Sequence, residues 1–170
     1  MKDGWIFIDK PKEISSFEVI RKLRKILNIK KIGHAGTLDP FATGVLAVAL
    51  GEATKSISYF NSRKSYQFQI LFGISKDTDD YTGKTLQTSD SIPSKKDIDI
   101  CLKHFIGFQQ QVPPRYSAVK INGKRAYKLA RENKSFEIKS KGVNIYNLKC
   151  IATQKKEEFR FTMECSSGTY

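Results

Sequence analysis

A single aspartate in a glycine-rich loop is the side chain of this sequence that is best placed for chemistry. Asp39 lies in the segment GHAGTLDP, residues 33–40, and a residue that precedes proline is held in extended backbone geometry. Six apolar residues follow at 45–50, and such a run indicates a strand buried on both faces, although a buried helix fits the same pattern. The segment predicts a carboxylate held rigidly at the mouth of a core strand, which suits a reactive group. The simpler interpretation is an Asx-Pro turn.

The residues before this loop predict a strand and then a helix. Residues 5–9 have the composition of a short strand. Ser15 with Glu18 three residues later is a capping box, which begins a helix. The apolar residues that follow recur at helical spacing and predict the face that packs on a core: Phe17, Ile20, Leu23 and Ile26 or Leu27.

The residues after the loop predict alternating strands and short helices. A short helix is expected from Gly51 to about Phe60, and residues 65–72 alternate as a strand with one aromatic face. Tyr66 begins that face, where its ring could cap the core or project into a cleft, and the core is the better interpretation from periodicity. A helix opened by Ser94 is predicted to face inward with Ile98, Cys101, Leu102 and Phe105. Residues 109–117 predict an irregular loop, and 118–121, 143–152 and 159–165 predict strands.

Composition and charge narrow the class of protein. The chain has 170 residues, enough for one domain with a hydrophobic core. No run reaches the length of a membrane span, and three scattered cysteines show neither metal spacing nor a disulfide framework. A cytoplasmic protein is the simplest expectation. Alternating carboxylates at 77–80 resemble a calcium loop but lack its final glutamate, so no metal site is predicted.

The net charge of +13, from 30 basic against 17 acidic residues, indicates a polyanionic partner such as nucleic acid. A genome that over-uses lysine would raise the same count, so the positions of the cations matter more. One helix face is basic and leads into the Asp39 loop, which fits either a solvated surface or a phosphate-contacting one. The cations expected at an RNA backbone are Arg21, Lys22, Arg24, Lys25, Lys31, Arg115 and Lys120.

Five segments in order resemble one family from end to end. They are IFIDKPKEISS, GHAGTLDPFATGVLAVALGEATK, KSYQFQILFGISKDTDDYTG, VPPRYSAVKINGKRAYKLAR and the final SSGTY. This set resembles the TruB family of bacterial tRNA pseudouridine-55 synthases. The resemblance implies an α+β fold, a largely antiparallel mixed sheet flanked by helices. It implies an enzyme that detaches, rotates and rejoins the base of a uridine in the tRNA T-loop, with no cofactor or metal, acting as a monomer.

The resemblance also implies roles for individual residues. Asp39 would be the nucleophile, since a carboxylate can add to the sugar or base and leave again. Tyr66 would stack on the extruded base and remove the final proton. His34 would fill the place that the uridine leaves, and Tyr170 would wall the uracil pocket. Lys10 is expected at the substrate, as the first candidate to stand in for an absent cation.

Two departures from the family pattern qualify these expectations. Glu13 stands where the family usually has glycine, which would shift a turn beside the site. The family motif continues after its tyrosine with an aliphatic residue and an arginine that pairs with the aspartate, whereas this sequence stops at Tyr170. Residues 1–170 are therefore expected to be a truncated catalytic domain that lacks the C-terminal RNA-binding domain and is itself inactive.

Two other functions remain open from the sequence. An RNA-folding or RNA-binding module would use the same basic surface without chemistry, but it would not need Asp39. The catalytic subunit of a guide-RNA pseudouridylation particle is related, but it carries longer basic extensions than this chain shows.

Overall fold

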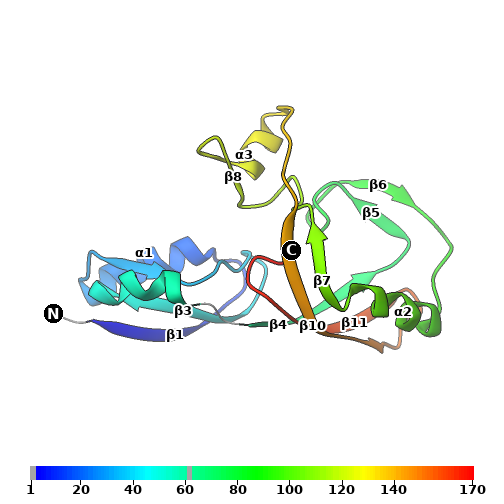
Figure 1. Cartoon of the computed structure of the whole chain (residues 1–170), viewed down its shortest axis with the longest axis horizontal. Coiled ribbons are helices and arrows are strands. Elements are labelled where there is room, and N and C mark those ends of the chain that lie inside the picture. The colour runs from blue at the N-terminus through cyan, green and yellow to red at the C-terminus, as the bar shows by residue number, and fades with distance from the viewer. Residues whose placement is uncertain (1–2, 61–62) are drawn as a thin grey trace. The chain divides into compact units, whose positions relative to one another are not determined.

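The computed structural model describes residues 3–60 and 63–170, and it divides the chain into two compact units, residues 1–62 and 63–170. Figure 1 shows strands and short helices in both. All strand pairs in the described residues are antiparallel. The predicted α+β class with antiparallel sheets is confirmed. The single catalytic domain expected from the sequence stays a prediction.

The first unit is a three-stranded sheet covered by one helix. Strand β3 (Gly44–Leu50) lies between β1 (Gly4–Lys10) and β2 (Ile32–His34). Helix α1 (Ser16–Leu27) begins with the predicted capping box of Ser15 and Glu18. The 3-10 helix η1 (Gly51–Tyr59) follows β3, in agreement with the short helix predicted there.

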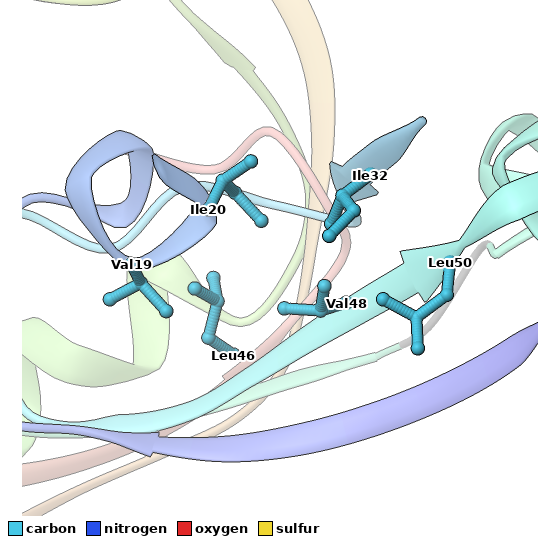
Figure 2. Packing of buried hydrophobic residues seen from close by; sticks show 6 residues of the cluster. All are labelled: Val19, Ile20, Ile32, Leu46, Val48 and Leu50. Carbon is cyan, nitrogen blue, oxygen red and sulfur yellow. The ribbon is translucent and has the colours of Figure 1, made fainter. Parts of the chain in front are cut away.

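The core of this unit joins α1 to the middle strand. Side chains of α1 and of β2 point toward those of β3 (Figure 2). The buried members are Val19, Ile20, Ile32, Leu46, Val48 and Leu50. Burial of each such aliphatic side chain contributes on the order of 2 kcal/mol, so this cluster is what holds the sheet and helix together.

Two details of the predicted core are wrong. On α1, Phe17 is 66% exposed, whereas Leu23 packs against the cluster as predicted. Of the alternatives Ile26 and Leu27, Leu27 packs there and Ile26 is 76% exposed. Ser16, Val19 and Ile20 are the buried residues of α1, so its inward face is rotated away from Phe17. On β3, Val45 is 70% exposed, so the strand is buried on both faces only from Leu46 onward.

The second unit is built on a four-stranded sheet in the order β4-β11-β10-β7. These strands are β4 (Lys64–Leu71), β11 (Glu158–Cys165), β10 (Lys141–Ala152) and β7 (Gly107–Gln111). Two small hairpins pair β5 (Ile74–Lys76) with β6 (Thr85–Thr88) and β8 (Lys120–Ile121) with β9 (Lys124–Arg125). The helices are α2 (Lys95–Leu102), the 3-10 turn η2 (Lys103–Phe105) and α3 (Ala126–Arg131).

The aromatic face predicted for residues 65–72 forms part of the core of this unit. Phe68 stacks on Phe161 with ring centroids 5.3 Å apart, and Phe72 meets Phe159 edge-on at 5.6 Å. Ile98 of α2 is buried against the same cluster. Helix α2 has the capping box of Ser94 and Asp97, so its predicted start is confirmed.

The rest of α2 and its surroundings differ from the prediction. Cys101, within the helix, is exposed, and Phe105, in the 3-10 turn that follows Leu102, is 48% exposed, whereas Ile98 and Leu102 pack against the cluster as predicted. Residues 109–111, predicted as loop, belong to strand β7, which pairs with β10. The strand predicted at 118–121 is limited to Lys120–Ile121. No helix among the described residues is long and apolar enough to cross a membrane.

Candidate active site

Asp39 is exposed on a loop whose backbone is anchored on both sides of it. Before it, the Ser16 hydroxyl donates to the Leu38 carbonyl at 3.0 Å and accepts from the Leu38 N–H at 2.9 Å. After it, the Lys10 ammonium donates to the Pro40 carbonyl at 3.1 Å. Both anchors are buried, Ser16 at 1% exposure and Lys10 at 0%. The loop therefore holds the backbone around Asp39 in place, as the sequence predicted, and it leaves this residue exposed.

The Lys10 ammonium is occupied by backbone carbonyls. Besides Pro40 it donates to the carbonyls of Pro11 and Ile14, each at 2.8 Å. An ammonium has three N–H donors and no acceptor, so three carbonyls satisfy it and offset the cost of burying its charge. The sequence placed Lys10 at the substrate, and the structure instead places it beneath the loop, as a group that positions the backbone.

His34 lies at the start of the same loop. Its Nδ1 is hydrogen-bonded to the Gly36 carbonyl, and since a carbonyl only accepts, Nδ1 carries the proton of this bond. The neighbouring Ala35 N–H donates to the Ala47 carbonyl on β3 at 2.9 Å. Gly36 has φ 110°, which favours glycine because a side chain would be strained there. These contacts direct the chain out of β2 and into the Asp39 loop.

Glu13 has a strained backbone in the turn next to Lys10. Its φ is 63°, in the left-handed region where a residue with a Cβ is disfavoured. The resemblance implied glycine at this position, and the geometry supplies the reason. Lys10 reaches the carbonyls of Pro11 and Ile14 on both sides of Glu13 in this turn.

In the second unit, Tyr66 lies on β4 opposite Met163 of β11. It is 38% exposed, so its ring does not lie in the buried core that periodicity favoured. Tyr170 follows the end of β11 at Cys165, which pairs with Lys64 two residues before Tyr66. Both tyrosines therefore belong to the same end of this sheet. Tyr170 is 48% exposed, and its backbone is hydrogen-bonded to Gln111.

The cations predicted at an RNA backbone fall into three groups. Arg24 donates to the Ile32 carbonyl at 3.2 Å, Arg115 donates to the Lys134 carbonyl at 3.0 Å, and both guanidinium groups thereby hold local structure. Arg21 lies 3.7 Å from Glu18 and Lys31 lies 2.8 Å from Glu52. Lys22, Lys25 and Lys120 are exposed and have neither a hydrogen bond nor an ion pair within the described ranges.

Glu52 is bound by two lysines at the end of β3. The hydrogen bond from Lys31, followed by that from Lys55, lowers the pKa of Glu52 to about 2. Lys55 Nζ lies 2.6 Å from the second carboxylate oxygen. All three side chains are solvent-exposed, so both ion pairs of Glu52 are screened by solvent and each is weak. Lys31, just before β2, is therefore paired with Glu52 in this structure.

In the acidic turn at residues 77–83, Asp77 and Asp80 accept hydrogen bonds from nearby backbone and hydroxyl groups. Burial raises the pKa of Asp80, but hydrogen bonds from Thr82 and Thr78 outweigh it and the pKa is lowered overall. Asp77 accepts from the Lys84 N–H at 2.8 Å. Within residues 3–60 and 63–170, no three side chains of metal-binding type come together.

Sequence reasoning missed two residues. Ser16 had a local signal, because a small polar residue three and four positions before the buried Val19 and Ile20 lies on the inward face of the helix. Gln111 had none, since its contact with Tyr170 spans 59 residues. Both act on backbone rather than on another side chain.

Known proteins resemble this chain in sequence and in fold. The family model described as "TruB family pseudouridylate synthase (N terminal domain)" matches residues 24–170. The chain is 45% identical over 168 residues to "tRNA pseudouridine synthase B" of Brucella anthropi, covering 98% of this chain and 52% of that protein. It is 47% identical over 169 residues to the protein of the same name from Ehrlichia chaffeensis, with 98% and 57% covered. The chain thus spans about half the length of these curated relatives.

Solved structures show the same fold. A Cbf5-Nop10-Gar1 complex contains a chain that is 28% identical, with a TM-score of 0.68, over 98% of this chain and 40% of that one. The structure titled "Crystal structure of the archaeal box H/ACA sRNP Nop10-Cbf5 complex" matches at 25% identity and a TM-score of 0.63, over 98% and 39%. The family model covers well over half of the chain, and the relatives agree along nearly all of it. This chain belongs to the TruB family of pseudouridylate synthases.

Proposed function

We propose that this chain supplies the catalytic aspartate of an enzyme that converts uridine to pseudouridine at position 55 in the T-loop of tRNA. The observation that carries the proposal is the placement of Asp39, exposed between two residues whose carbonyls are anchored by the buried Ser16 and Lys10. A binding module has no need to hold one carboxylate in this way. The names of the curated relatives support tRNA as the substrate.

The chemistry assigns each residue a physical task. The carboxylate of Asp39 adds to the sugar or the base, and the glycosidic C–N bond breaks. The base then rejoins the sugar through carbon, and the bond to Asp39 breaks, which frees the carboxylate for another cycle. The proton lost from that carbon is balanced by one gained at the freed nitrogen, so the product is an isomer of the substrate. Tyr66 stacks on the extruded base and takes the proton, His34 fills the vacated place in the T-loop, and Tyr170 walls the pocket. The proposal calls for no metal or cofactor.

The RNA is held by cations that the fold leaves available. Lys22, Lys25 and Lys120 are exposed and can each neutralise a phosphate. Arg24 and Arg115 instead donate hydrogen bonds to the backbone carbonyls of Ile32 and Lys134. A monomeric enzyme in the cytoplasm remains our expectation.

The test replaces the carboxylate with its neutral isostere. Because the relatives are about twice as long, we would use a chimera in which Tyr170 is followed by the residues that continue the Brucella anthropi protein. Asp39→Asn in this chimera should abolish pseudouridine formation, measured by tritium release from tRNA, while tRNA affinity stays within about tenfold. Asp9→Asn, on β1 and outside the loop, is the matched control and should retain activity. Turnover by Asp39→Asn close to that of the parent chimera would refute the role of Asp39.

A second candidate function is the catalytic subunit of a guide-RNA particle, which the similarity to the Cbf5 complexes favours. The 45–47% identity to proteins named tRNA pseudouridine synthase B, against 28% to the chain of the Cbf5 complex, favours an enzyme that acts on tRNA without a guide RNA. Modification of unassisted tRNA by the chimera, with no guide RNA added, decides between the two.

A further inference from the structure

The last residues of the second unit are fixed to the sheet by side-chain hydrogen bonds as well as backbone ones. The Ser166 N–H donates to the Asn144 carbonyl at 2.8 Å, and the Asn144 N–H donates to the Ser166 hydroxyl at 2.9 Å. The Thr169 hydroxyl donates to the Ser166 carbonyl at 2.9 Å. Residues 166–169 therefore form a turn that is tied to β10 at its first residue.

Gln111 fixes the other end of this turn. Its Nε2 donates to the Tyr170 carbonyl at 2.6 Å, and its Oε1 accepts from the Tyr170 N–H at 2.9 Å. A side-chain amide has the same donor and acceptor as a peptide group, so Gln111 bonds Tyr170 as a neighbouring strand would. Gln111 itself is the last residue of β7 and pairs with Lys141 of β10.

The other two glutamines of the same strand do not share this role. Gln109 donates to the His104 carbonyl at 3.1 Å, next to its own strand. Gln110 is exposed and has no hydrogen-bonding partner within the described ranges. The pair of hydrogen bonds to Tyr170 is thus specific to the position of Gln111 and is not a general property of the glutamine-rich strand.

We call the two hydrogen bonds between Gln111 and Tyr170 the clamp. The clamp holds the backbone of Tyr170 and leaves the residue partly exposed. Both Gln111 bonds go to main-chain atoms, and the residue remains 48% exposed. With N–H and carbonyl both held, the direction of the Cα–Cβ bond is set, and the ring can sample only its side-chain rotamers. A ring restrained in this way loses little entropy when a flat ligand packs against it.

We propose that Gln111 is a positioning residue that sets the Tyr170 ring against the uracil base of the RNA. The inference rests on the proposed function, because it takes the uridine as the ligand. Gln111 does not touch the base in this account. It acts through the Tyr170 backbone, from a strand that lies 59 residues earlier in the chain.

The first experiment needs no RNA. In the 170-residue chain, Gln111→Ala should speed hydrogen exchange of the Tyr170 amide, followed by NMR, by about fivefold to tenfold, because that N–H loses its acceptor. Gln111→Glu keeps an acceptor but loses the donor, and it should give a smaller increase. Gln110→Ala, on the same strand, should leave the rate unchanged. Equal rates in Gln111→Ala and Gln110→Ala would overturn the clamp.

The second experiment measures the consequence for the reaction in the chimera. At a temperature where all variants are fully folded, Gln111→Ala should lower kcat/KM about tenfold with an unchanged Tm, whereas Gln110→Ala should match the parent. A merely structural role would lower Tm and leave the kinetics of the folded enzyme intact, which would overturn the inference. Absence of turnover in the parent chimera would instead refute the proposed function, and the exchange experiment would still decide whether Gln111 holds Tyr170.

Discussion

At the scale of single residues, the site depends on polar groups that never reach the solvent. Lys10 and Ser16 are almost completely buried, and their hydrogen bonds to Pro40 and Leu38 bracket the exposed Asp39. Burying an ammonium is costly unless its donors are satisfied. Three carbonyls satisfy it here, so the cost is offset, and the loop obtains a rigid support that backbone contacts alone would not provide.

Lys10→Met tests this support. The methionine side chain fills similar space but leaves three carbonyls without their donor, so the free energy of unfolding should fall by about 2–4 kcal/mol. Chemical denaturation of the 170-residue chain would measure it. Lys12→Met, at an exposed position two residues away, should change stability by no more than about 0.5 kcal/mol. Equal effects of the two substitutions would mean that the ammonium of Lys10 contributes nothing.

Glu13→Gly tests the strained turn beside Lys10. Because Glu13 has φ 63°, glycine should relieve the left-handed strain and raise the free energy of unfolding by about 1 kcal/mol. Lys12→Gly is the control, since Lys12 is not among the described residues with positive φ, and there glycine should destabilise through the entropy of the unfolded chain. Thermal unfolding of the two variants should therefore give opposite shifts in Tm. A fall in Tm for Glu13→Gly would contradict the strain at this turn.

At the scale of elements, α1 serves two purposes on its two faces. Val19, Ile20 and Leu23 pack toward β3, while Lys22 and Lys25 lie exposed one turn apart. Arg24 lies between them in sequence but bonds the Ile32 carbonyl at the start of β2. The basic face is therefore narrower than its composition suggests, and two lysines are its free cations.

Replacing Lys22 and Lys25 by glutamine should weaken tRNA binding and lower the slope of log K against log salt by about 1–2, because fewer counterions are released. The core of α1 is untouched, so Tm should barely change. Lys84→Gln with Lys96→Gln makes the same change of charge at two exposed positions of the other unit, and it should leave the slope close to that of the parent. An unaltered slope in the α1 variant would show that this face is a solvated surface that does not contact RNA phosphates.

At the scale of the whole molecule, each unit has a core of its own. One joins α1 to β3, and the other joins α2 to the aromatic face of the four-stranded sheet. Large apolar side chains also remain at the surface of the first unit, among them Phe7 at 63% and Tyr59 at 85% exposure. Exposed apolar residues of this size favour association when they are contiguous.

We predict that the 170-residue chain binds a T-loop stem-loop weakly and forms no pseudouridine, whereas the chimera is active. In the family that the sequence resembles, an arginine after the tyrosine of the last motif pairs with the aspartate, and the chimera supplies it. Such a charge-assisted pair keeps a carboxylate ionised and oriented. Mass spectrometry of the RNA would measure the pseudouridine formed, and the Asp39→Ala variant of each protein would serve as the inactive control. We also expect the shorter chain to scatter more light in solution. Robust turnover by the 170-residue chain would show that the site is complete without that arginine.

The sequence alone determined the local elements and the family. Capping boxes at Ser15 and Ser94 predicted both helix starts, and the alternation at 65–72 predicted β4 with its aromatic face. These signals depend on neighbours within one or two turns, so they can be read without knowing the fold. The five motifs likewise identified the family, because each is a continuous stretch of chain whose residues and order are fully contained in the sequence.

Only the tertiary structure decided which polar side chains support the site. Lys10 was predicted at the substrate and is buried under the loop, and Phe17 was predicted in the core and is exposed. Ser16 reaches Leu38 across 22 residues, and Gln111 reaches Tyr170 across 59. The physical reason is the same in each case. A hydrogen bond between distant segments depends on where packing brings their backbones, and neither composition nor periodicity of either segment contains that information.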